Sequence, residues 1–182
     1  MTTKEKILKS ALKLFAKQGI DKTSTAQITK DVGIASGTLF VHFKTKQALI
    51  DTIYLRIKRS AFAGLAQKIE STKSIEDNVK KTAEITINYF IKNYAEFIFM
   101  GLVDNDPQVS QEAVETAYKE FEPLIAAFSK WHKDGAFKNL ELKLLLDILW
   151  SNLIVIIKYC KSKKLKKVDP KYLETIWDAI KK

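Results

Sequence analysis

Residues 33–43 read GIASGTLFVHF, and they contain no lysine or arginine although the chain of 182 residues carries 31. Positive charge returns directly afterwards, at Lys44 and Lys46. On a helical projection Leu39 and Phe43 share one face, one turn apart, and can pack on a preceding helix. The segment therefore predicts a short helix with one buried face and one free face.

The free face of this helix is small and uncharged, and it carries Gly37, Thr38, Val41 and His42. A short helix at residues 25–32 and a turn at Gly33 precede it, which together match a helix-turn-helix. In that arrangement the second helix enters the DNA major groove, where bulk at its tip is a handicap and flanking cations meet phosphates. The alternative is a helical hairpin packed in a core, in which Gly37 only relieves a contact.

The segments on either side are predicted to be helical. Upstream, apolar residues of the stretch 4–18 recur at three- and four-residue steps, and Gly19 follows as a cap. Ser24 and Gln27 form a capping-box pattern that starts the helix at 25–32. No strand pattern of useful length occurs anywhere in the sequence. The expectation is an all-α fold of about nine helices, with a helix-turn-helix domain at 1–45 and a larger domain at 46–182.

Apolar periodicity and helix-capping patterns also predict the helices of the larger domain. An apolar stripe runs over six turns from Lys46 to Ile69, and Asp106-Pro107 is a typical helix start. Pro123 is expected to kink or split the helix that follows. The helices expected after the stripe span residues 74–92, 93–102, 106–134, 139–161 and 170–180.

The net charge of +10 is unevenly distributed. Residues 1–60 hold twelve Lys or Arg against four Asp or Glu, whereas residues 61–182 hold nineteen against seventeen. An N-terminal excess of this kind indicates a polyanion-binding end. A solvated lysine-rich surface and a basic amphipathic membrane helix are the alternatives.

Catalysis and metal binding find little support in the sequence. Cys160 is the only cysteine, so no internal disulfide can form, and His42 and His132 are the only histidines. No phosphate loop, nucleophile motif or metal-ligand spacing occurs, so we expect no enzyme, no cofactor and no metal. The N-terminus lacks the apolar core of a signal peptide and no stretch reads as a membrane span, which predicts a cytoplasmic protein.

Residues 7–50 resemble the N-terminal signature of the tetracycline-repressor (TetR) family of transcription regulators. The resembling parts are the A-x-x-L-F-x-x-x-G run from Ala11, the Thr23–Ser24 pair, the V-G-I-A turn, the G-T-L-F-x-H-F run and K-x-x-L. They cover about a quarter of the chain. The resemblance implies an all-helical homodimer whose two N-terminal domains occupy successive major grooves of a palindromic DNA operator. It also implies a C-terminal cavity for a small molecule that weakens DNA binding.

The resemblance and the charge pattern together assign the expected DNA contacts. These residues are Thr25, Ala26, Ser36, Gly37, Thr38, Phe40, Val41, His42, Lys44 and Lys46. Two of them depart from the family pattern, since Phe40 is more usually tyrosine and Ala26 often carries a longer polar side chain. Few direct base contacts are therefore expected, with more reliance on phosphate contacts and DNA shape.

The aromatic side chains of the larger domain are numerous enough to line an apolar cavity, although aromatics at helical spacing are usually core. The residues expected to bind the effector are Phe62, Tyr89, Phe90, Tyr94, Phe97, Phe128, Trp131 and Trp150. Asn88, Asn93 and Asn152 could orient the ligand, or they could satisfy backbone groups instead. The effector is expected to be a small apolar or amphipathic molecule.

The last two helices carry more apolar surface than one neighbour needs, which predicts a four-helix dimer interface. The residues expected in it are Leu142, Leu149, Leu153, Ile156, Leu173 and Trp177. Ordinary burial within a monomer is the alternative.

Three functions remain open on this reading. The first is a dimeric repressor that releases its operator when an effector binds. The second is a small-molecule-binding helical dimer whose DNA binding is vestigial. The third is a basic helical adaptor on membranes or RNA.

Overall fold

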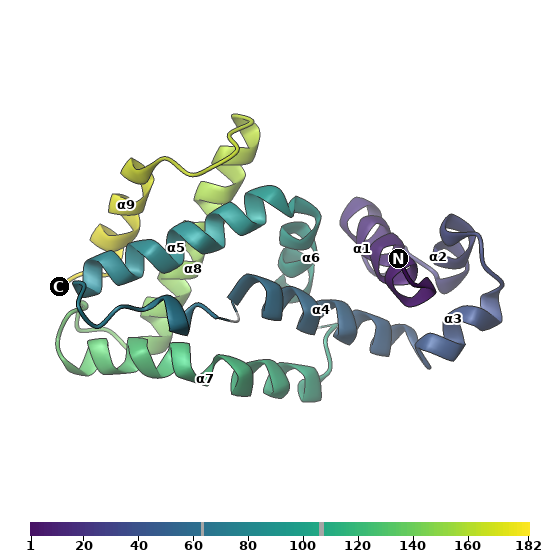
Figure 1. Cartoon of the computed structure of the whole chain (residues 1–182), viewed down its shortest axis with the longest axis horizontal. Helices are drawn as coiled ribbons and strands as arrows, with labels where there is room; N and C mark the ends of the chain where they lie inside the picture. Colours follow the sequence, from purple (N-terminus) through teal and green to yellow (C-terminus); the bar gives the residue numbers. More distant parts are fainter. Residues whose placement is uncertain (63, 106–107) are drawn as a thin grey trace. The chain divides into compact units, whose positions relative to one another are not determined.

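The computed structural model of the chain describes residues 1–62, 64–105 and 108–182, and these residues form nine α-helices and one short 3₁₀ helix (Figure 1). The all-α prediction is therefore confirmed. The chain divides into two compact units, one made of residues 1–60 and 93–118 and the other of residues 61–92 and 119–182.

The first unit contains the N-terminal helices. They are α1 (Thr3–Gln18), α2 (Thr25–Val32), α3 (Ser36–His42), most of α4 (Lys46–Phe62) and α6 (Tyr94–Asn105). Helix α1 packs against α2, α3 and α6, so it forms the centre of this unit. Phe15 of α1 and Phe99 of α6 are both fully buried, with their ring centroids 6.1 Å apart.

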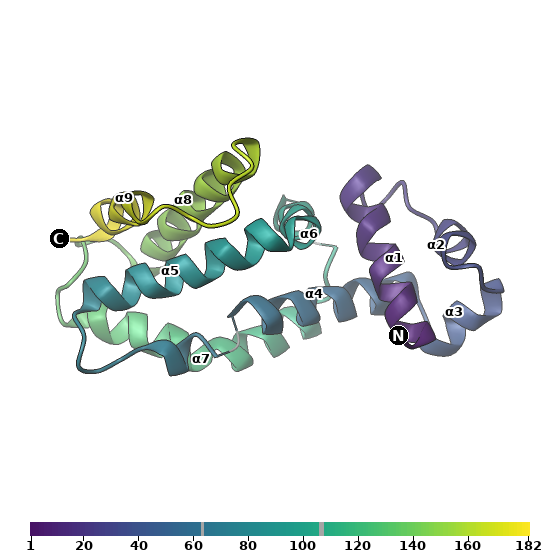
Figure 2. The ribbon, with the colours of Figure 1, turned by 45° about the horizontal axis from the view of Figure 1, so that its top comes forward.

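The second unit is built around α5 (Ile75–Lys92). A 3₁₀ helix (Ala66–Lys68) precedes α5, and the unit also holds most of α7 (Gln111–Lys133), α8 (Leu142–Ser162) and α9 (Pro170–Ile180). Helix α5 packs against α8 and α9, and the two views agree that these three helices lie side by side (Figures 1 and 2). One buried apolar cluster lies among them, made of Val79, Phe128, Trp131, Phe137, Leu145 and Ile180.

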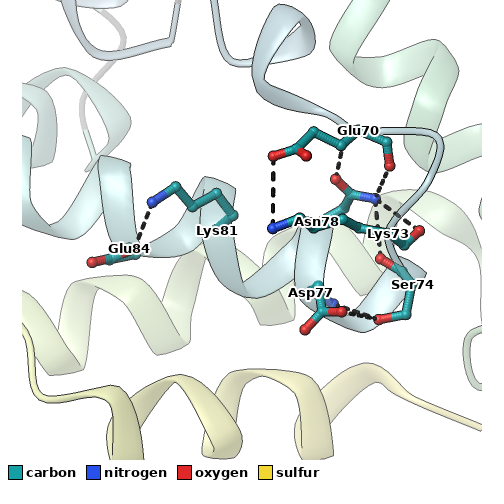
Figure 3. Close-up of polar contacts among 7 residues, drawn as sticks. All are labelled: Glu70, Lys73, Ser74, Asp77, Asn78, Lys81 and Glu84. Atoms are coloured by element: carbon teal, nitrogen blue, oxygen red, sulfur yellow. Dashed lines mark hydrogen bonds and ion pairs between the residues drawn. The ribbon is translucent and has the colours of Figure 1, made fainter.

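The buried Asn78 fixes the entry to α5 (Figure 3). Its side-chain oxygen accepts the backbone N–H of Glu70 at 2.8 Å, and its amide nitrogen donates to the carbonyls of Glu70 and Ser74. The Ser74 hydroxyl caps the helix by accepting the N–H of Asp77 at 3.0 Å. One buried amide thus satisfies backbone groups that would otherwise be left without partners inside the protein.

The structure departs from the expected elements in four places. Helix α6 runs to Asn105, three residues beyond the expected end at residue 102. Helix α4 ends at Phe62, and Gly64 has a φ of +87°, so the stripe that reaches Ile69 is not one helix. Pro123 lies inside α7 without splitting it. Helix α8 begins at Leu142, three residues later than expected. The expected start at Asp106-Pro107 lies outside the described residues.

No helix among the described residues combines the length and the apolarity that a membrane crossing requires.

Candidate functional site

Helix α3 presents one buried face and one exposed face, as its sequence predicts. Leu39 is fully buried and Phe43 is 3% exposed, and both belong to the same unit as the buried Ile7, Phe15 and Ile28. The ammonium of Lys4 lies 5.6 Å from the centre of the Phe43 ring. Burial of Leu39 and Phe43 holds α3 in place. With only seven residues, this helix would not be stable in isolation.

The outward face of α3 exposes apolar side chains. Val41 is 82% exposed and Phe40 is 47% exposed, and both rank among the most exposed large hydrophobic residues of the described chain. Gly37 and His42 are exposed beside them, and Thr38 is half-buried. Methyl-bearing and aromatic side chains of this kind can contact thymine methyl groups in a major groove.

Gly37 has no packing role among the described residues. A Cβ atom built on it would meet no atom of the described residues within 4 Å, and its φ is not positive. The alternative in which Gly37 only relieves an internal contact is therefore wrong. A glycine inside a helix destabilises it by roughly 0.5–1 kcal/mol relative to alanine. The described residues therefore do not account for this glycine.

Side-chain hydrogen bonds fix the turns around α2. Ser24 and Gln27 form the predicted capping box, with distances of 3.2 Å and 2.8 Å between the paired atoms. The buried Thr23 hydroxyl donates to the Gly19 carbonyl at 2.7 Å. Gly33 ends α2 with a φ of +75°, the left-handed conformation that glycine adopts without strain.

An acidic group ties α1 to α2. The Ser10 hydroxyl donates to Asp31 at 2.7 Å, and the Lys13 ammonium lies 3.4 Å from the other carboxylate oxygen. The Ser10 hydrogen bond, followed by Lys13, lowers the pKa of the Asp31 carboxyl. The carboxylate stays ionised at neutral pH, so its contacts with Ser10 and Lys13 hold α2 against α1.

The remaining predicted DNA contacts differ in exposure. Ala26, Ser36 and Lys44 are exposed, whereas Thr25 is half-buried. Lys46 is also half-buried, and its ammonium donates to the Ile20 carbonyl at 2.6 Å. An ammonium has three donors, so Lys46 can hold this turn and still reach a phosphate.

The second unit contains an apolar cavity of about 160 Å³. Its lining residues are Phe62, Leu65, Thr82, Ala83, Thr86, Leu124, Ile125, Phe128, Leu146, Leu149, Trp150 and Leu153. No charged side chain is among them. The hydroxyls of Thr82 and Thr86 donate to the backbone carbonyls of Val79 and Thr82, each at 2.9 Å. The cavity therefore suits a neutral, largely apolar molecule.

Three of the eight residues predicted to bind an effector line this cavity, namely Phe62, Phe128 and Trp150. Phe90 supports the wall, because its ring lies 6.1 Å from Phe62 and 6.0 Å from Trp150.

Four other predicted effector residues lie away from the cavity wall. Tyr89 packs on Phe90, and Trp131 packs on Phe128. Tyr94 and Phe97 belong to the other unit, where their rings lie 5.4 Å apart. Asn152 donates to the Ile148 carbonyl, so it satisfies backbone and does not line the cavity.

Sequence reasoning missed the small residues of the cavity. Thr82, Ala83 and Thr86 form one patch on α5, at a spacing that places small side chains together on a single face. That spacing was the available signal. The prediction named only aromatic residues, because aromatic side chains contribute the largest apolar surface areas.

The residues predicted for a dimer interface are largely covered by their own chain. Leu153, Ile156 and Leu173 are buried, while Leu142, Leu149 and Trp177 are half-buried against the apolar cluster defined above. Leu149 and Leu153 also line the cavity. The apolar side chains that α8 exposes are Leu144, Val155 and Tyr159.

Comparison with known proteins identifies the N-terminal segment. Residues 7–53 match the family model described as bacterial regulatory proteins, tetR family. The HTH-type transcriptional regulator UidR of Escherichia coli K12 is 30% identical over 108 residues, which cover 59% of this chain and 55% of that protein. The HTH-type transcriptional regulator YerO of Bacillus subtilis 168 is 28% identical over 119 residues, 64% of this chain and 40% of that protein. The chain thus spans about half the length of these curated relatives.

The fold is also shared with a solved structure over almost the whole chain. A TetR family transcription regulator from Marinobacter aquaeolei VT8 superposes with a TM-score of 0.86 over 98% of this chain and 95% of that one, at 14% identity. At this identity the likeness concerns the fold alone. The helix-turn-helix at α2 and α3 lies within residues 7–53, the segment that matches the family model. This N-terminal segment is therefore similar to the tetR family of bacterial regulatory proteins, and the rest of the chain shares the fold.

Proposed function

We propose that this protein is a transcriptional repressor that binds a palindromic DNA operator as a homodimer and releases it when a small neutral molecule occupies the cavity of the second unit. The observation that carries the proposal is the outward face of α3. This face carries Val41, which is 82% exposed, and Gly37, which no packing among the described residues requires, and it lies in a helix-turn-helix.

The chemistry of this face favours DNA over RNA or a membrane. A recognition helix must approach base edges closely, which Gly37 permits, and its charges belong at the flanks, where Lys44 is exposed. A membrane-binding helix would instead alternate lysines with a broad apolar face. Transcription regulation by DNA binding leaves no role for catalysis.

Dimerisation follows from the half-site geometry of helix-turn-helix proteins, whose two reading heads sit one DNA turn apart, about 34–36 Å. The exposed Leu144 and Val155 are eleven residues apart on α8 and therefore share a face. We assign the centre of the dimer contact to this face, with Tyr159 at its edge. The buried leucines beneath it shape α8 and line the cavity.

The lining of the cavity supports one class of effector. A cavity of about 160 Å³ lined by aromatic and aliphatic groups accommodates a single ring without rearrangement, and larger molecules require Phe62 or Trp150 to move. A carboxylate or an ammonium would lose its hydration there without gaining a charged partner. The effector is therefore an uncharged aromatic or aliphatic compound.

Two helices can carry the effect of ligand binding along the chain. Helix α4 has the cavity-lining Phe62 at its last position and Lys46 at its first. Helix α7 contributes Leu124, Ile125 and Phe128 to the cavity and begins at Gln111. A displacement of either helix can alter the separation of the two reading heads, and linkage requires that DNA weaken effector binding by the same factor.

The test is binding of the full-length protein to genomic DNA fragments, measured by gel shift over a series of salt concentrations. The proposal predicts a sharp preference for fragments with an inverted repeat, with affinity falling steeply as salt rises. A library of neutral and charged compounds is then screened for release of the selected fragment, and only neutral compounds should release it. Equal binding to all fragments, or none, contradicts the proposal.

A further inference from the structure

A second, chemically different groove lies within the same unit, at the end of α5 and beside the segment that joins α8 to α9. Its volume is about 610 Å³, within the range of small-molecule sites. Five of its lining residues are lysines: Lys92, Lys161, Lys164, Lys166 and Lys167. No acidic side chain lines it. The chain from residue 158 to residue 167 contains six lysines and no Asp or Glu.

Four of the five lysines of this groove are not neutralised by ion pairs within the described residues. Lysines elsewhere in this unit pair with carboxylates, as Lys143 does with Asp147 at 2.9 Å and Lys171 does with Asp169 at 3.1 Å. Four lysines of the groove form no ion pair with any described residue: Lys92, Lys164, Lys166 and Lys167. The partial charge of a helix C-terminus offsets only about half a unit charge. The groove is therefore strongly positive.

The backbone that carries these lysines is fixed. The Leu165 N–H donates to the Cys160 carbonyl at 2.9 Å and the Lys164 N–H donates to the Lys161 carbonyl at 3.1 Å, the two bonds of a Schellman motif. Lys164 occupies the left-handed position of this motif, with a φ of +56°, where glycine is the usual residue. A lysine in this backbone conformation has a higher conformational free energy than a glycine would have.

The end of the segment is anchored to α5. The buried Val168 donates its N–H to the side-chain oxygen of Asn88 at 2.8 Å. Asn88 also lines the groove, so its amide is held in place by this bond. A run of lysines is usually a solvated, mobile surface, but here both ends of the run are held by specific hydrogen bonds.

Two apolar residues line the groove together with the lysines, the buried Ile91 and the partly exposed Leu165. An inorganic anion needs only the charges, whereas apolar side chains beside a cluster of cations accommodate a molecule that has both an anionic group and an apolar body.

We propose that this groove binds a phosphorylated organic molecule with an aromatic or aliphatic body, at a site separate from the neutral cavity. The phosphate contacts Lys166 and Lys167 at the rim, and the body lies on Ile91 and Leu165. The site goes beyond the operator and effector sites and does not depend on either of them.

The experiment measures binding to the full-length protein by isothermal titration. The probes are 4-methylumbelliferyl phosphate, the uncharged 4-methylumbelliferone and inorganic phosphate. The proposal predicts one aryl phosphate per chain, bound at least tenfold more tightly than inorganic phosphate. The double substitution Lys166→Gln/Lys167→Gln should weaken the aryl phosphate at least tenfold. Lys164→Gly should weaken it too without loss of thermal stability, because glycine suits this backbone conformation.

The matched control is Lys119→Gln/Lys133→Gln, which removes two exposed lysines outside the groove. This control should change the aryl phosphate affinity less than twofold. Equal losses in both double variants would show a general charge effect and overturn the proposal, as would binding of inorganic phosphate with equal affinity. Loss of binding to anionic phosphatidylglycerol vesicles or random DNA in the groove variant, with no displacement by the aryl phosphate, would assign the groove to a macromolecule and also overturn it.

Discussion

Asp51 of α4 accepts the backbone N–H of Ser110 at 2.9 Å, immediately before α7 begins. The same carboxylate oxygen accepts the side-chain amide of Gln47 at 2.9 Å, and Gln47 also donates to the Gln108 carbonyl. Gln108 in turn reaches Asp21 in the turn before α2. The segment that starts α7 is thus tied to the first turns of α4 and to the helix-turn-helix.

Replacing Asp51 by alanine should reduce the coupling between effector and operator. Helix α7 lines the cavity further along its length, so in the proposed mechanism the Asp51–Ser110 bond would pass a displacement of α7 to α4. The effector-induced drop in operator affinity should shrink at least threefold, measured by fluorescence anisotropy with the neutral ligand identified in the screen. The control is Glu115→Ala, an exposed residue of α7 that contacts Gln111. Unchanged coupling in the Asp51 variant would rule out this route.

Replacing Gly37 by alanine should have opposite effects on folding and on DNA binding. Stability should rise by about 0.5–1 kcal/mol, because alanine favours the helix and its Cβ has open space. Operator affinity should fall at least tenfold, since the methyl group enters the closest approach to the bases. Chemical denaturation and anisotropy measure the two effects.

Gly101 of α6 provides the matched control for this substitution. It is also helical, and a Cβ there would likewise meet nothing within 4 Å. Gly101→Ala should therefore stabilise the protein without weakening the operator complex. A Gly37→Ala variant that keeps full operator affinity would show that this face does not approach DNA.

Replacing Ala83 by leucine should fill part of the neutral cavity. Ala83 is buried and lines the cavity from α5, so the larger side chain occupies the space that a ligand needs. Binding of toluene, a neutral probe of suitable size, should fall at least tenfold in titration calorimetry, while operator binding persists. Ala126→Leu, on the exposed surface of α7, should leave toluene binding unchanged. Normal toluene binding by the Ala83 variant would place the ligand site elsewhere.

The protein should lose stability between about pH 10 and pH 12 through Tyr54. Burial, followed by the charges of Asp104 and Tyr118, raises the pKa of Tyr54 from 10.0 to about 12. The folded protein therefore retains a proton that the unfolded chain releases above pH 10, and unfolding becomes easier as pH rises through this window.

Ultraviolet titration of the phenols checks this expectation. Tyr54 should ionise about two pH units later than an ordinary phenol, and Tyr54→Phe should remove that step. The hydrogen bond with Tyr159 also raises the pKa of Tyr172, so a delayed ionisation of Tyr172 should remain in the variant. A titration curve that Tyr54→Phe leaves unchanged would contradict the expectation.

The sequence was sufficient for the helix-turn-helix because its signals are local. The capping box at Ser24 and Gln27, the left-handed Gly33 and the apolar pair Leu39 and Phe43 act within a few residues, and all three are found in the structure. The helix that starts at Lys46 was predicted too long, because the periodicity continues past Gly64 although the helix does not.

The ligand and dimer surfaces were harder to predict because they depend on which faces of packed helices stay open. Leu153 and Val155 are both apolar residues of α8, but only packing decides that the first is buried and the second is exposed. The small cavity residues of α5 gave no strong hydrophobic signal, and the Tyr94–Phe97 pair contributes to a different unit. The assignments of DNA, effector and dimer contacts to individual residues stay predictions.

The most direct test of the central claim selects binding sequences from random DNA with the wild type and with Val41→Glu, a change at a side chain that is 82% exposed. The control is Leu140→Glu, which introduces the same negative charge at another exposed apolar side chain. The wild type and the control should enrich one inverted repeat with half-sites about 34–36 Å apart, while Val41→Glu, folded and of unchanged stability, should enrich none. Enrichment of the same repeat by Val41→Glu would contradict the assignment of α3 as the helix that reads DNA.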